Sequence, residues 1–140
     1  MKNTKKKGFT LVELVIVIAV IAILAAVLIP TFTSVIQNAN ASKKLQELKS
    51  TIDNEYIDYV AKNNEVPKVL YYNNVYTFTK PTSCTSYTLT GSTASKTFVK
   101  LDSTYNVYLL WDAVDGSYSI EISSTAPTGY TSATETTISQ

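Results

Sequence analysis

The chain opens with a lysine-rich stretch that runs directly into a long apolar segment. From Leu14 to Ile29 no residue carries a charge or a hydroxyl group, and residues 9–29 make 21 positions in all. A helix of that length, rising about 1.5 Å per residue, covers the hydrocarbon core of a bilayer, which is about 30 Å thick. Because positive residues stay on the cytoplasmic side, the lysines before this segment predict that the chain after Pro30 lies outside the cytoplasm.

A second helical pattern follows the apolar segment. Apolar side chains recur there at spacings of three and four residues, which places them on one face of a helix: Leu45, Leu48, Ile52, Tyr56 and Tyr59. We expect this helix to reach about residue 60 or 62, because Asn63-Asn64 is typical of a helix end and Pro67 prevents resumption. The simplest role for the apolar face is packing against a sheet, and the alternative is a partner-binding face.

From about residue 69 the pattern changes to short runs rich in Tyr, Thr and Val, which are typical of strands. The expected strands cover residues 69–72, 75–79, 87–90, 97–101, 105–113 and 118–123. Asp115-Gly116 predicts a hairpin with a two-residue loop, which would pair Trp111 with Ile120 and Leu109 with Ile122. In this register the apolar pairs collect on one side, which we expect to cover the apolar face of the helix.

Charge and composition exclude several classes of function. The chain has 140 residues, with 12 lysines, no arginine and 11 acidic residues, and its formal net charge is +1. Without residues 1–8, which hold four of the lysines, the formal charge becomes −3, so the remainder has no basic footprint for nucleic acid. The absence of histidine and the single cysteine, Cys84, exclude histidine acid–base chemistry, Cys/His metal sites and an intrachain disulfide.

Glu13 is the residue of the apolar segment that a simple membrane anchor does not explain. A carboxylate at the centre of a membrane helix costs about 2.5 to 3.5 kcal/mol, and less toward the end where Glu13 lies. The lysines of the leader are one possible partner, since their long side chains can reach along the membrane surface. A more specific interpretation comes from the junction around Glu13, which reads Lys-Lys-Lys-Gly-Phe-Thr-Leu-Val-Glu-Leu at residues 5–14.

This junction resembles the class III signal of type IV prepilins and pseudopilins. The resemblance rests on a basic leader that ends at Gly8, the aromatic Phe9, the acidic Glu13 and a late proline, Pro30. It implies cleavage between Gly8 and Phe9 by a membrane peptidase, N-methylation of Phe9, and a role for Glu13 in assembly. Proline lacks the amide donor of a helix, so Pro30 either ends the span or, as in the family, interrupts a helix that continues.

If the chain is cleaved as the resemblance implies, electrostatics supplies a partner for Glu13. Cleavage creates a cationic amine on Phe9, four residues and about 6 Å along a helix from Glu13. An ion pair at about 4 Å is worth about 4 kcal/mol at an effective dielectric constant of about 20, which is similar to the cost of inserting the carboxylate. The two groups of one chain are poorly placed to meet. We therefore hypothesise that Glu13 attracts the Phe9 amine of a neighbouring subunit during filament growth.

Other groups of residues have weaker functional patterns. Asp102, Asp112 and Asp115 lack the spacing of a calcium-binding loop, so turn and surface roles are expected. Cys84 is expected to be a free thiol, with intermolecular pairing as the alternative, and its isolation favours a pilin of the Gram-positive type. Five tyrosines are expected to pack in the sheet and not to form a conductive or adhesive patch: Tyr71, Tyr72, Tyr76, Tyr105 and Tyr108. We expect no catalytic, cofactor-binding or metal-binding residue.

The sequence thus predicts an α+β, pilin-like fold, in which a long amino-terminal helix, half transmembrane and half amphipathic, packs on a small antiparallel sheet. The expected divisions are a cleaved leader (1–8), an apolar assembly helix (9–29), its amphipathic continuation (30–62), a β head (63–123) and a Ser/Thr-rich loop or tail (124–140). One alternative for the tail is that residues 134–138 add a strand to the edge of the sheet.

The expected function is that of a non-enzymatic structural subunit of a type IV pilus. The precursor would cross the cytoplasmic membrane once, with its head outside, and would reach the cell surface in the assembled pilus. The implied partners are other pilin subunits, the prepilin peptidase, a platform protein and an assembly ATPase, besides membrane lipid before assembly. Two alternatives stay open: a pseudopilin of a type II secretion or DNA-uptake system, and a signal-anchored surface protein whose head binds a ligand.

Overall fold

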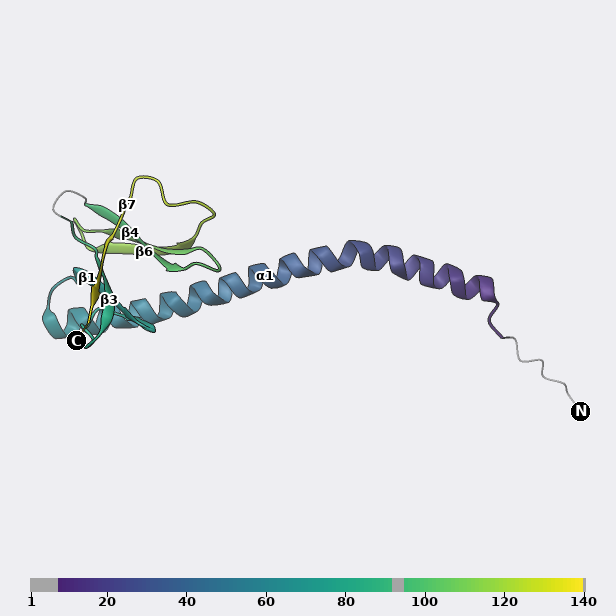
Figure 1. Cartoon of the computed structure of the whole chain (residues 1–140), viewed down its shortest axis with the longest axis horizontal. Helices are drawn as coiled ribbons and strands as arrows, with labels where there is room; N and C mark the ends of the chain where they lie inside the picture. The colour runs from purple at the N-terminus through teal and green to yellow at the C-terminus, as the bar shows by residue number, and fades with distance from the viewer. Residues whose placement is uncertain (1–7, 92–94, 140) are drawn as a thin grey trace, which may run out of the picture. The chain divides into compact units, whose positions relative to one another are not determined.

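The computed structural model describes residues 8–91 and 95–139 of the chain, in which one helix is followed by eight strands (Figure 1). The helix, α1, spans Leu11–Asn63. The strands are β1 (Val69–Asn73), β2 (Val75–Thr77), β3 (Cys84–Thr88), β4 (Lys96–Asp102), β5 (Val107–Asp112), β6 (Ser117–Ile122), β7 (Thr131–Ser132) and β8 (Thr134–Ile138). The chain forms two compact units, Met1–Asn40 and Ala41–Gln140. The second unit, called the head below, contains the last part of α1 and all eight strands.

The head contains two sheets where the sequence predicted one. Sheet A has the strand order β2-β1-β3-β8, and sheet B has the order β6-β5-β4-β7. All neighbouring strands are antiparallel except β4 and β7, which are parallel. The predicted fold class is confirmed, since a long apolar helix is followed by antiparallel sheets on which its last turns pack.

The apolar face of α1 packs into the core of the head, as the spacing of its residues predicted. Leu48 and Ile52 are 7% and 0% exposed, and burying side chains of this size stabilises a fold by about 1.5 to 3 kcal/mol each. Trp111 of β5 is also 0% exposed, and its ring stacks on that of Tyr118 of β6 at a centroid distance of 5.7 Å. Other α1 side chains lie partly buried against the same core: Leu45, Tyr56 and Tyr59.

The register of the β5–β6 hairpin differs from the predicted one by two residues. Trp111 pairs with Tyr118, not with Ile120, and Asp112 pairs with Ser117. The loop is therefore residues 113–116 and not the Asp115-Gly116 pair alone. Because side chains alternate between the two faces of a strand, a shift of two residues leaves every side chain on its predicted face. The prediction was wrong in register and right in the face that enters the core.

Side chains within the β5–β6 loop explain its length. The Asp112 carboxylate accepts a hydrogen bond from the Val114 N–H at 3.0 Å, and the Asp115 carboxylate accepts one from the Ser117 N–H at 2.9 Å. The Gly116 N–H also donates to the carbonyl of Asp112 at 2.9 Å. Such bonds from aspartate to the backbone two residues on stabilise turns, and here two of them in succession favour the longer loop.

The carboxy-terminal residues add one strand to each sheet. The edge strand expected near residues 134–138 is β8, which pairs with β3 in sheet A. The preceding β7, which was not expected, pairs with β4 in sheet B. Because β6 and β7 are the two outer strands of sheet B, the segment 123–130 leads from one edge of that sheet to the other. Figure 1 shows it as the loop that precedes the label β7.

Gly116→Ala is expected to destabilise the head more than Gly129→Ala. Both glycines have positive φ angles, 72° and 81°, where an alanine is strained by about 1 kcal/mol. A Cβ on Gly116 would also lie 2.5 Å from Cγ1 of Val66, whereas one on Gly129 would meet nothing within 4 Å. We expect losses of about 1 kcal/mol for Gly129→Ala and about 2 to 4 kcal/mol for Gly116→Ala, measured by urea unfolding with Trp111 fluorescence. Equal losses would mean that Val66 moves aside without cost.

Candidate functional site

The helix begins with a reciprocal interaction between Thr10 and Glu13. The hydroxyl oxygen of Thr10 accepts a hydrogen bond from the Glu13 N–H at 3.2 Å, and Oε2 of Glu13 accepts one from the Thr10 N–H at 3.2 Å. This capping box satisfies two backbone donors that the first turn of a helix leaves free. This role of Glu13 was not predicted, although a threonine three residues before a glutamate is the usual signal of a capping box.

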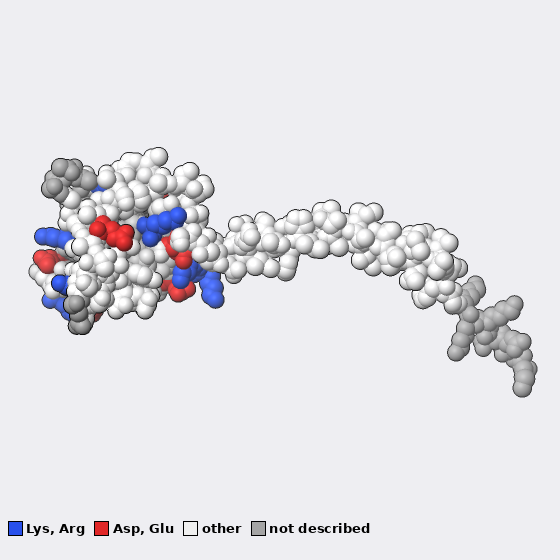
Figure 2. Space-filling view, in the orientation of Figure 1, with Lys and Arg blue, Asp and Glu red and all other residues white. Residues whose placement is uncertain are grey.

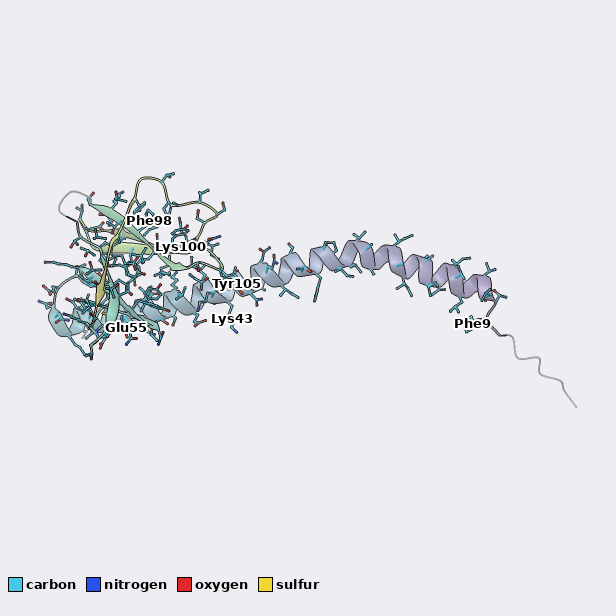
Figure 3. The ribbon with its side chains drawn as sticks, viewed as in Figure 1. Phe9, Lys43, Glu55, Phe98, Lys100 and Tyr105 are labelled. Atoms are coloured by element: carbon cyan, nitrogen blue, oxygen red, sulfur yellow. The ribbon has the colours of Figure 1, made fainter. Side chains whose placement is uncertain are left out.

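The predicted cleavage residues lie immediately before the helix. Gly8 and Phe9 are exposed and belong to no regular element, and Phe9 is 94% exposed (Figure 3). A Cβ on Gly8 would meet nothing within 4 Å. The packing of the described residues therefore does not require glycine at this position. The predicted leader lysines are outside the described residues.

The first unit presents an apolar surface that no other described part of the chain covers. Glu13 is the single charged residue between Gly8 and Ser42, and the face drawn in Figure 2 is white along this stretch. Large apolar side chains are exposed throughout it, and Ile18 and Ile29 are 56% and 65% exposed. By length and composition α1 can cross a membrane. A surface of this kind needs lipid or protein to cover it.

Helix α1 continues through Pro30 and does not end there. The sequence left open whether Pro30 ends the helix or lies within a longer one, and the structure supports the second alternative. The Thr31 hydroxyl donates a hydrogen bond to the Val27 carbonyl at 3.1 Å, and the Thr33 hydroxyl donates to the Ile29 carbonyl at 3.0 Å. Hydroxyl groups paired in this way inside the helix suit apolar surroundings, where no water can pair with them.

The structure brings only some of the predicted site residues together. Phe9 and Glu13 lie within about one helical turn of each other, but the hydrogen-bond partner of the Glu13 carboxylate is Thr10. Pro30 lies well along the helix from both. One chain therefore supplies the carboxylate, the aromatic residue and the apolar surface, and the described residues place no amine beside the carboxylate.

The three aspartates considered as a calcium site, Asp102, Asp112 and Asp115, hold turns. Asp102 accepts a hydrogen bond from the Tyr105 N–H at 2.8 Å, and Asp112 and Asp115 hold the β5–β6 loop. Hydrogen bonds from the side chain and backbone of Ser117 keep the pKa of Asp115 below its ordinary value. These are the turn roles that the sequence predicted.

Cys84 and most of the tyrosines considered above are packing residues. Cys84 is a free thiol that is 7% exposed on β3, which gives a second chain little access to it. Tyr76 and Tyr108 are 7% and 6% exposed, as expected for sheet packing. Tyr72 departs from that expectation because it is 38% exposed.

Two hydrogen bonds connect carboxylates of α1 to strands of both sheets. The Tyr118 hydroxyl of β6 donates to Asp53 at 2.5 Å, and the Thr77 hydroxyl of β2 donates to Glu55 at 2.5 Å. Burial, and after it the hydrogen bond to Asp53, raise the pKa of Tyr118 above its ordinary value. Burial likewise raises the pKa of Tyr76.

The stability of the head is expected to fall above about pH 10. An unfolded tyrosine ionises near that pH, whereas the folded head keeps Tyr76 and Tyr118 protonated to higher pH. Their contribution to stability is thus complete below about pH 10 and is lost as the pH rises toward the folded pKa values. Tyr118→Phe should weaken this alkaline fall and, by loss of the bond to Asp53, lower the free energy of unfolding at pH 7 by about 1 kcal/mol.

Urea unfolding at a series of pH values measures both effects. Tyr130→Phe is the control, because Tyr130 lies outside the contact with Asp53, and it should follow the wild type. An alkaline fall of the same size in Tyr118→Phe and wild type would contradict the assignment.

Comparisons with known proteins agree with the geometry of the amino-terminal helix. Residues 3–29 match the family described as the prokaryotic N-terminal methylation motif. The chain is 36% identical over 110 residues to the type IV wide pilus major component PilA4 of Thermus thermophilus, and the match covers 79% of this chain and 73% of that protein. No solved structure matches the chain.

Two further relatives match over shorter stretches. The chain is 40% identical over 60 residues to the type IV major pilin protein PilE1 of Neisseria gonorrhoeae, covering 41% of this chain and 36% of the relative. It is 49% identical over 47 residues to the fimbrial protein EcpB of Eikenella corrodens, covering 34% of this chain and 30% of the relative. The match to PilA4 is longer and covers most of both proteins. By this match and by its amino-terminal motif, the chain belongs to the type IV pilin family.

Proposed function

We propose that this chain is a structural subunit of a type IV pilus, made as a membrane-anchored prepilin and polymerised into a filament on the cell surface. The observation that carries the proposal is the exposed apolar surface of the first unit, with one carboxylate, Glu13, in the first turn of the helix. Lipid can cover this surface before assembly and copies of the same helix can cover it afterwards. The similarity to PilA4 and PilE1, which are named as a major pilus component and a major pilin, supports a position in the shaft.

Processing would act on the bond between Gly8 and Phe9. Both residues are exposed and outside regular structure, so a peptidase could bind this stretch in an extended conformation without unwinding α1. Glycine has no side chain to obstruct the approach of the backbone to a cleft. Cleavage by a prepilin peptidase on the cytoplasmic side, followed by methylation of the new amine, would start the mature chain at Phe9, two residues before the helix.

Glu13 would then direct assembly. Its insertion in a membrane helix costs up to about 2.5 to 3.5 kcal/mol, and an ion pair with the Phe9 amine of a neighbouring subunit would offset that cost. Thr10 holds the carboxylate at the first turn in the meantime. A platform protein and an assembly ATPase would supply the extraction from the membrane, so the chain itself needs no catalytic residue.

Mass spectrometry of the full chain, extracted from membranes of cells that contain a prepilin peptidase, tests the processing step. The expected product begins at Phe9 and carries the added mass of a methyl group. Gly8→Val should keep the leader, because its branched side chain obstructs the scissile bond. An intact leader on the wild-type chain would reject the proposal in favour of a signal-anchored surface protein.

Electron microscopy of material sheared from the cell surface tests the polymer. Long filaments that bind an antibody against the head support a pilus. Short filaments point to the alternative of a pseudopilin in secretion or DNA uptake, and head antigen that stays with the membrane as single copies contradicts both.

A further inference from the structure

The head carries a hollow that neither its core nor the amino-terminal helix uses. It has a volume of about 280 Å³ and lies at the end of sheet A where β1 turns into β2. The residues that line it are mostly polar: Tyr72, Asn73, Asn74, Ser83, Thr85 and Thr137, besides Cys84. None of these side chains carries a charge.

The register of sheet A places three of the lining residues in a row. Tyr72 of β1 lies opposite Thr85 of β3, and Thr85 lies opposite Thr137 of β8. Residues that pair directly point to the same face, and neighbouring strands are about 4.8 Å apart. The ring of Tyr72 therefore borders two hydroxyl groups at successive strand spacings.

Tyr72 is exposed and at the same time held in place. Its ring packs on that of Tyr76 at a centroid distance of 4.7 Å. Tyr76 is buried, and its hydroxyl donates a hydrogen bond to the carbonyl of Leu101 at 2.8 Å. Tyr72 also lines a second hollow, of about 210 Å³. A ring that is already fixed loses little conformational entropy when a ligand covers it.

The chemistry of the lining matches a ligand with an apolar C–H face and a rim of hydroxyl groups. The face of an aromatic ring is electron-rich and attracts C–H groups, while hydroxyl and amide side chains both donate and accept hydrogen bonds. A purely apolar ligand would leave these polar groups unpaired, which costs free energy. An ion would find no opposite charge in the lining.

We propose that this hollow binds a neutral sugar residue, with Tyr72 as its stacking platform and Asn74, Thr85 and Thr137 as its hydrogen-bonding partners. The site lies entirely within the head and does not depend on cleavage or polymerisation. Binding can therefore be measured whether or not the chain assembles into a pilus.

The test uses the full chain in a phosphocholine detergent, because glucoside and maltoside detergents carry sugars that would compete for the site. Saturation-transfer NMR is recorded with the methyl glycosides of glucose, galactose, mannose, N-acetylglucosamine and N-acetylgalactosamine. For a single sugar we expect a dissociation constant on the order of 1 mM. Tyr72→Ala should weaken binding about tenfold or more, whereas Tyr72→Phe, which keeps the ring, should stay within about threefold of wild type.

Thr137→Val and Thr136→Val form a matched pair. The two residues are neighbours on β8 and both are exposed, but they point to opposite faces of the sheet. Thr137→Val should weaken binding about threefold to tenfold because it removes a hydrogen-bonding hydroxyl, and Thr136→Val should bind as wild type. The near-ultraviolet circular dichroism of Trp111 checks that each variant is folded.

Two results would overturn the proposal. One is the absence of saturation transfer from the wild-type chain to every sugar of the panel. The other is binding that Tyr72→Ala and Thr137→Val leave at the wild-type level.

Discussion

Glu13→Gln is expected to abolish filaments while cleavage before Phe9 proceeds normally. Glutamine keeps the capping box, because its amide oxygen can still accept the hydrogen bond from the Thr10 N–H, but it lacks the negative charge. The ion pair with a neighbouring amine is worth about 4 kcal/mol, so its loss weakens the addition of each subunit by about a thousandfold. Sheared surface material should contain less than about 1% of the wild-type amount of pilin.

Thr10→Ala separates the charge of Glu13 from its capping role. This variant keeps the carboxylate and loses the hydroxyl that accepts the Glu13 N–H, which costs about 1 kcal/mol at the start of the helix. Filaments should still form in amounts near wild type. Normal assembly of Glu13→Gln together with loss of filaments in Thr10→Ala would reverse the assignment and make the cap the functional feature.

Ile52→Asp is expected to unfold the head. Ile52 is 0% exposed at the centre of the contact between α1 and the sheets, and an aspartate there combines a cavity with a buried carboxylate. The expected loss is at least about 4 kcal/mol, most of the stability that a domain of this size has. Urea unfolding of the full chain in detergent, followed by the fluorescence of Trp111, measures it.

Ile57→Asp is the matched control for Ile52→Asp. Ile57 belongs to the same stretch of α1 but is 66% exposed, so the same change should shift the free energy of unfolding by no more than about 0.5 kcal/mol. A similar loss in both variants would show that the charge acts on the helix itself and not on its packing.

The helix and the face it buries could be predicted because both follow from the spacing of apolar residues. Leu48 and Ile52 recur at a helical interval, and burial of that face is the favourable way to cover the strands. The side of β5 that carries Trp111 was likewise correct, since alternation along a strand does not depend on the length of the loop. Cleavage between Gly8 and Phe9 stays a prediction, which rests on the resemblance to a known signal and not on periodicity.

The predictions failed where a few side chains, or pairing between distant strands, determine the conformation of the backbone. The β5–β6 loop is longer than predicted because Asp112 and Asp115 both bond to backbone amides within it. The capping box of Thr10 and Glu13 was not predicted, because one residue, Glu13, combines a backbone cap with a charge that the proposed assembly also requires. The division into two sheets depends on long-range pairing, which strand patterns do not reveal, and the short β7 has no alternation to recognise.

The carboxy-terminal strands have a consequence for a nicked form of the protein. A protease cut within residues 123–130 would leave β7 paired with β4 and β8 paired with β3, so both sheets would keep all of their strands. The two pieces should then migrate together in a native gel and separate in denaturant. For the same reason, this segment is the natural place to insert an epitope for labelling filaments, whereas a truncation before β7 would remove an edge from each sheet.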